Sequence, residues 1–193
     1  MWVQRAAIRP VPLYAQVPLR ALSDIESRLG DEGDQARRLL DEAFSRFEKC
    51  QPALSARVAQ VLSEPIDETA LALGYFLTLA VWLAFDRLFS SDINEISQTE
   101  LKGVEESMHV DEELRLSDPG EAIDTDDVVA MEQPDILAFV HEHIDAALES
   151  NASDVDVDDV HAIYRTVMIE VLALSYAVRP PRNWALITTE YTA

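Results

Sequence analysis

Acidic side chains with regular spacing are the first feature of this sequence that could support chemistry. Asp154, Asp156 and Asp158 alternate along one polar stretch. Oxygen ligands at alternate positions are how a protein loop wraps Ca²⁺, so these three residues are candidate ligands. However, Asp159 and Arg165 stand where such a loop needs a glycine and a final glutamate. Acids at the start of a helix also favour its positive dipole end, so a solvated helix start is the competing interpretation.

A second set of oxygen ligands lies between residues 89 and 101. Asp92, Asn94 and Glu100 match in kind the ligands of an EF-hand loop, which these thirteen residues resemble. The resemblance implies a Ca²⁺ ion held by loop side chains and by a final bidentate glutamate, Glu100. The stretch departs from the pattern because Ser90 replaces the first aspartate, the turn glycine is missing and the loop is one residue short. A cation-responsive protein is therefore the second hypothesis.

Catalytic chemistry has less support. His109 and His161 each follow a carboxylate by three residues, the ligand spacing of di-iron bundles, but such ligands must point inward, and we do not expect that of these two. His141 and His143 lie at the edges of an apolar stripe, which favours partly buried structural roles. Cys50 lies on an apolar helical face, which predicts a buried, unreactive thiol. Because hydrolase, nucleotide-binding and redox motifs are also missing, we expect no enzyme, and an enzyme with an unrecognised site is the third hypothesis.

Charge is the most unevenly distributed property of the chain. The formal net charge is −21, yet residues 1–63 and residues 161–193 each carry only +1. Residues 92–160, the acidic segment, hold twenty-two Asp/Glu and two Lys/Arg, a net charge of −20. Phosphate binding needs clustered cations, so nucleic acid and anionic membranes are disfavoured as direct partners. The natural counterpart is a basic protein surface or a cation.

The first hypothesis is an acidic interaction module. Segregated charge costs self-repulsion, and a general acidic bias would have affected both flanks as well. A negatively charged helical surface steers toward a basic partner and can occlude it, as an inhibitor, an immunity protein or a nucleic-acid mimic does. Simple solubility is the competing interpretation. The candidate contact residues are Glu105, Glu106, Asp111, Glu112, Glu113, Asp124, Asp126 and Asp127.

These side chains need a scaffold, and its centre is the stretch 70–85. Only Gly74 and Thr78 interrupt its apolar residues, and it carries no charge. A helix that is apolar on every side must be surrounded by protein or lipid. At a rise of ~1.5 Å per residue it spans about 24 Å, short of the ~30 Å of a bilayer core. Without flanking Lys/Arg clusters, we expect a buried central helix and not a membrane span.

Other helices follow from apolar residues at i, i+3, i+4 and i+7. The expected ranges are 19–29, 34–50, 52–62, 94–114, 124–132, 134–150 and 157–178. Pro52 and Pro134 suit the first position of a helix. With six to eight helices and no confident strand, the sequence predicts an all-α fold, an irregular multi-helix bundle around the central helix with extended N- and C-terminal arms.

The expected organisation is an extended, proline-containing arm at 1–20, one helical domain at 21–178 and a C-terminal tail at 179–193. A single cysteine permits no internal disulfide, and the first residues lack the apolar run of a signal peptide. A cytoplasmic location is therefore expected. No cofactor is expected, with calcium as the alternative.

Overall fold

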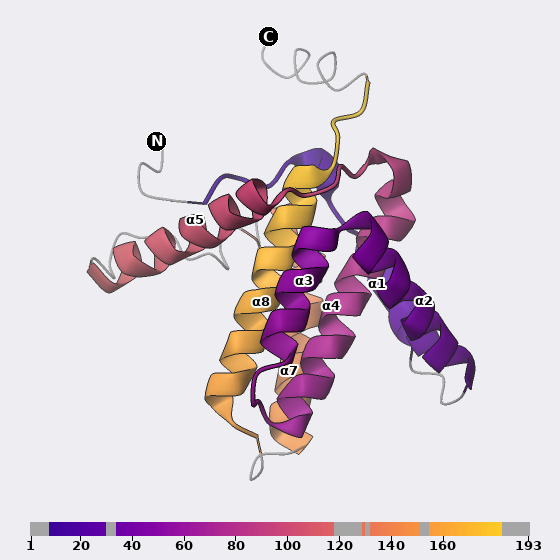
Figure 1. Ribbon diagram of the computed structural model, residues 1–193, viewed down its shortest axis with the longest axis vertical. Coiled ribbons are helices and arrows are strands. Elements are labelled where there is room, and N and C mark those ends of the chain that lie inside the picture. Colours follow the sequence, from indigo (N-terminus) through magenta and orange to yellow (C-terminus); the bar gives the residue numbers. More distant parts are fainter. Residues whose placement is uncertain (1–7, 30–33, 118–128, 130–131, 151–154, 183–193) are drawn as a thin grey trace.

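The computed structural model describes residues 8–29, 34–117, 129, 132–150 and 155–182. Within these ranges the chain forms seven α-helices and no β-strand, so the prediction of an all-α bundle is confirmed (Figure 1). The helices are α1 (Leu19–Leu29), α2 (Asp34–Cys50), α3 (Pro52–Leu62), α4 (Glu68–Phe89), α5 (Gln98–Ser117), α7 (Pro134–Ser150) and α8 (Val157–Ala177). A 3-10 turn, η1 (Leu13–Ala15), precedes α1, and another, η2 (Ser90–Asp92), follows α4.

Helix α4 contains the predicted central stretch and is enclosed by the other helices. Asp67 caps its start by accepting a hydrogen bond from the Ala70 N–H at 2.8 Å. Leu77 and Val81 are fully buried and Trp82 is 2% exposed. By length and composition α4 is the one helix in the described part of the chain that could cross a bilayer, but 61% of its apolar window is buried inside the protein.

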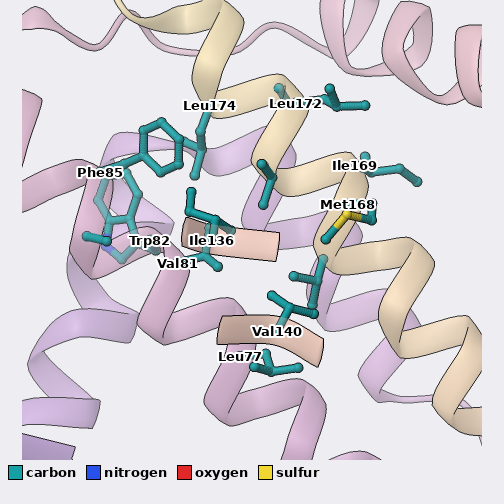
Figure 2. Close-up of a cluster of buried hydrophobic side chains, with 14 of the residues drawn as sticks. Leu77, Val81, Trp82, Phe85, Ile136, Val140, Met168, Ile169, Leu172 and Leu174 are labelled. Atoms are coloured by element: carbon teal, nitrogen blue, oxygen red, sulfur yellow. The ribbon is translucent and has the colours of Figure 1, made fainter. Parts of the chain in front are cut away.

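Helices α4 and α8 lie side by side and run in the same direction (Figure 1). Gly74 allows this approach, because a Cβ atom there would lie 2.5 Å from Ile163 Cδ1 and 2.8 Å from Leu62 Cδ2. Figure 2 shows the side chains that fill the space between the helices. They are Leu77, Val81, Trp82 and Phe85 of α4, Ile136 and Val140 of α7, and Met168, Ile169, Leu172 and Leu174 of α8. Burial of such apolar area, at ~25 cal/mol per Å², is the main stabilising contribution.

The described part of the N-terminal arm is packed into the core. Ile8, Val11, Ala15 and Val17 are all buried. Gln133 holds this segment, because its Oε1 accepts from the Val17 N–H at 2.9 Å and its Nε2 donates to the Ala15 carbonyl at 2.6 Å. Buried polar groups are tolerated when they are hydrogen-bonded in this way, so the arm is a fixed part of the bundle from residue 8 onward.

Within the described residues the expected ranges 19–29, 34–50, 52–62, 134–150 and 157–178 agree with the structure to within one residue, whereas α5, expected at 94–114, spans Gln98–Ser117. This helix begins at Gln98 instead of 94 because the preceding residues bond elsewhere. The Asn94 N–H donates to the Ala177 carbonyl, and the Ile96 N–H donates to Gln51 Oε1. The expected tail beyond residue 182 and most of the expected helix at 124–132 lie outside the described residues.

Candidate functional site

Helix α5 carries most of the candidate contact residues and projects away from one end of the bundle (Figure 1). Its inward stripe is formed by Leu101, Val104 and Met108, all buried as predicted. Asp111 continues this stripe at i+3 from Met108 and is 0% exposed. The expectation that Asp111 belongs to an exposed contact surface is therefore corrected.

Two other α5 carboxylates contact arginines from the nearly neutral flanks. Glu105 forms an ion pair with Arg57 of α3, and Glu112 lies 3.2 Å from Arg165 of α8. Partly exposed pairs of this kind contribute ~0.2–1 kcal/mol each, so they orient α5 more than they stabilise the fold. Glu105 and Glu112 are consequently less available to a partner than the sequence suggested.

Glu106 and Glu113 remain exposed on the outer side of α5. Lys102 lies 3.4 Å from Glu106, and His109 Nε2 lies 3.5 Å from Glu113. Exposed pairs such as these are weak and are screened by salt, so both carboxylates are accessible to a basic partner. The last three candidate contact residues, Asp124, Asp126 and Asp127, lie outside the described residues.

Helix α7 presents an acidic stripe that sequence analysis did not single out. Glu142, Asp145 and Glu149 occupy positions i, i+3 and i+7 and are all exposed. None of the three has a hydrogen bond or ion pair in the part of the chain that the structure describes. The signal was present in the sequence, because the inward stripe that starts at Ile136 and Val140 leaves these acids on the opposite face.

A separate group of acids, the acidic end, consists of Asp67, Glu68, Asp156, Asp158 and Asp159. The Asp156 N–H donates to Asp67 Oδ2 at 3.2 Å, and the Asp67 N–H donates to Asp159 Oδ2 at 2.8 Å. The starts of α4 and α8 thus cap each other. Acids at these two positive dipole ends are stabilising, which favours the helix-start interpretation of Asp156 and Asp158. Asp154 lies outside the described residues.

The loop that resembles an EF-hand forms a junction between helices. Asp92 pairs with Arg179 at 3.1 Å, and Asn94 bonds through its backbone to the end of α8. Glu100 Oε2 accepts from the Ser97 N–H at 2.8 Å and from the Ser97 hydroxyl at 2.7 Å, which caps α5 and lowers the pKa of Glu100. Among the described residues no group of three or more His, Cys, Asp or Glu could hold a metal ion.

Gln51 organises the same junction and was missed by sequence analysis. Its side chain is 1% exposed. Its Nε2 donates to the Asn94 carbonyl at 3.0 Å and its Oε1 accepts from the Ile96 N–H at 2.9 Å. Loss of these partners would leave buried polar groups unpaired, which costs ~1–3 kcal/mol per group. No periodic signal marks Gln51, because it lies in the break between α2 and α3.

A pocket of ≈ 410 Å³, named here the arm pocket, lies where α5, α8 and the N-terminal arm meet. Its volume falls in the range of about 300–1,000 Å³ that is usual for small-ligand sites. The Arg9 guanidinium lies 4.0 Å from the centre of the Tyr176 ring, and the Tyr176 hydroxyl donates to the Arg9 carbonyl. Burial raises the pKa of Tyr176 to about 12, so the hydroxyl stays neutral. The apolar lining includes Ile8, Ile96, Val104, Leu172 and Ala177.

The histidines and the cysteine do not converge on this pocket. His143 is packed against Phe76 and Phe139, with ring centres 4.9 Å and 4.3 Å away, so the prediction that it is partly buried is confirmed. His141 is exposed, contrary to the prediction of partial burial. Cys50 is also exposed and not buried, because its position at the last residue of α2 lies beyond the packed part of the helix face.

Glu170 of α8 is a buried acid that sequence analysis also missed. It is 0% exposed, and in the described part of the chain neither carboxylate oxygen has a hydrogen-bond partner. Burial raises the pKa of Glu170 well above its ordinary value, because an apolar environment penalises the charged form. The sequence signal was a lone acid within the apolar run 167–174.

The chain matches no protein-family model, and it has no significant match among curated proteins or solved structures. Charge, burial and geometry of the described residues are therefore the observations that bear on function.

Proposed function

We propose that this protein is an acidic helical interaction module that binds and occludes a basic partner surface. The observation that carries this proposal is the charge of −20 in residues 92–160. Three arginines from the flanks, Arg57, Arg165 and Arg179, form ion pairs with this segment in the described structure. Within the described part of this segment, Glu95, Glu142, Asp145 and Glu149 are exposed and form no hydrogen bond or ion pair, so these four carboxylates are available to a cationic partner.

The proposed contact residues are Glu106 and Glu113 on α5 and, as a separate acidic patch, the α7 stripe of Glu142, Asp145 and Glu149. All five carboxylates are exposed. A surface of one charge raises the association rate with an oppositely charged partner and disfavours partners of like charge. Because the attraction acts between exposed groups, it should weaken steeply with ionic strength.

Capture from native lysate at low and high salt tests this proposal. We expect a basic protein to be retained at low salt and released at high salt. The triple variant Glu142→Gln, Asp145→Asn, Glu149→Gln should retain less of it. A matched control changes three exposed acids of α2 by the same chemistry, Asp41→Asn, Glu42→Gln and Glu48→Gln, and should behave as the unmodified protein. Retention that is independent of salt, or the capture of no basic protein, contradicts the proposal.

A further inference from the structure

In the described part of the chain, Gly74 and Gly103 lie inside helices, and of these two Gly74 alone is required by close packing. Glycine within a helix costs ~1 kcal/mol relative to alanine. At Gly74 that cost is offset by close packing, since a Cβ would meet Ile163 and Leu62 at under 3 Å. At Gly103 of α5 a Cβ would meet nothing within 4 Å. The fold therefore does not require glycine at position 103.

Gly103 lines the arm pocket, and the space that it leaves open belongs to that pocket. Helix α8 contributes Leu172, Ala173, Tyr176 and Ala177 to the lining. Gly103 adds no side chain to the α5 part of the lining, so it occupies none of the pocket volume. Glycine at residue 103 would therefore be explained by a ligand that occupies the arm pocket.

Among the described residues of the pocket lining, two are acidic and one is basic. Glu95 is exposed and has no hydrogen bond or ion pair in the described part of the chain. Glu100 is held ionised by its hydrogen bonds to Ser97. Arg9, the one cation among the described lining residues, is stacked on the Tyr176 ring. Because the pocket also opens within the acidic segment, its electrostatic preference is for a cationic occupant.

We propose that the arm pocket binds an apolar anchor side chain that is flanked by lysine or arginine in the basic partner. This inference rests on the proposed function and adds to it the place where the partner is anchored. The apolar walls would bury the anchor, and Glu95 and Glu100 would face the flanking cations. A buried aliphatic or aromatic anchor gains enough free energy for about a tenfold or greater increase in affinity over charge alone.

Two synthetic peptides of equal charge test the pocket directly. One is acetyl-Lys-Lys-Leu-Trp-Leu-Lys-Lys-amide, which has an apolar anchor, and the other is acetyl-Lys-Lys-Ser-Gly-Ser-Lys-Lys-amide, which has none. Fluorescence anisotropy of labelled peptides at low salt gives both affinities. We expect the anchored peptide to bind at least about tenfold more tightly to the unmodified protein. The variant Gly103→Phe should abolish this difference and leave the affinity of the anchorless peptide unchanged.

Gly103→Ala is the matched control, because it adds a Cβ without filling the pocket, and it should preserve the tenfold difference. Gly103→Leu replaces Gly103→Phe if circular dichroism shows that the phenylalanine variant does not fold. Glu95→Lys should weaken binding of both peptides, whereas Glu48→Lys on α2 should not.

The outcomes separate the two proposals. If both peptides bind equally, and equally to Gly103→Phe, the charge-based function stands and the pocket inference is overturned. If neither peptide binds at low salt, the pocket inference is overturned, and the charge-based function is decided by the capture experiment described above. Light scattering measures the oligomeric state and so tests whether a second copy of this chain occupies the arm pocket. A dimer that Gly103→Phe converts to a monomer would also overturn the inference.

Discussion

Helix pair α4–α8 and helix α5 show two ways in which one chain positions a helix. The α4–α8 pair is held by apolar contacts on nearly all sides, with Leu77 and Val81 of α4 fully buried. Helix α5 has one narrow apolar face, and its start is fixed by polar contacts from Gln51. Along its length it is tied to the bundle by arginine ion pairs.

The difference between the two regions separates stability from recognition. Apolar burial supplies the larger free energy per residue, while exposed ion pairs contribute little and are screened by salt. The α4–α8 pair should therefore tolerate few changes, and α5 should tolerate many. Residues of α5 and of the arm pocket can therefore be suited to binding a partner with little loss of folding stability. Four experiments test this contrast.

The largest effect is expected from truncation in the central helix. Leu77→Ala should lower the free energy of unfolding by about 3 kcal/mol, because it removes a fully buried side chain and leaves a cavity. Val110→Ala on α5, where the side chain is 44% exposed, should change it by less than about 0.5 kcal/mol. Urea denaturation measures both. Similar losses for the two variants would remove the contrast between the regions.

Glu170 should make the α4–α8 interior sensitive to pH. Its pKa is raised in the folded state, so the folded protein holds a proton that the unfolded chain releases. The contribution of Glu170 to stability should be greatest below its unfolded pKa, near 4.5, and should be lost as pH rises toward the folded pKa, by ~1.4 kcal/mol per pH unit.

Denaturation of the unmodified protein and of Glu170→Gln across pH 4 to 7 checks this expectation. The glutamine variant cannot titrate at this site, so the stability difference between the two proteins should change with pH in the stated direction. Glu106→Gln, at an exposed position of α5, should show no comparable change. Parallel pH profiles for Glu170→Gln and the unmodified protein would contradict the assignment.

The two helical glycines should respond to alanine with opposite signs. Gly74→Ala should destabilise by about 1 kcal/mol, because overpacking of ~1–3 kcal/mol exceeds the helix-propensity gain of ~1 kcal/mol. Gly103→Ala should stabilise by about 0.5–1 kcal/mol, because its Cβ meets no neighbour within 4 Å. Thermal or urea unfolding measures both changes. A shift of the same sign at both sites would show that packing at Gly74 is not limiting.

The smallest effect concerns the Arg57–Glu105 pair that ties α5 to α3. A double-mutant cycle with Arg57→Ala and Glu105→Ala should give a coupling energy below about 1 kcal/mol, because both side chains are partly exposed. The coupling should decrease further in high salt. A coupling of several kcal/mol, unaffected by salt, would mean that α5 is held as firmly as the interior helices.

Periodicity was sufficient for the scaffold but not for every site residue. Apolar spacing identified the described helices, and the inward positions Leu101, Val104 and Met108 follow from it. The same spacing also places Asp111 on the inward face, yet its charge suggested exposure. Acidic loops suggested calcium, whereas Asp92 forms a tertiary ion pair with Arg179 and Glu100 caps the start of α5 through local hydrogen bonds from Ser97.

The sequence by itself determined the helical class, the enclosed central helix and the concentration of negative charge in one segment. These depend on local spacing and composition, which the order of residues contains directly. Only the tertiary structure decided that Arg57 and Arg165 reach α5, that Gln51 fixes its start, and that Gly103 faces a pocket. Such contacts join residues far apart in the chain, and their partners are defined only after the helices pack.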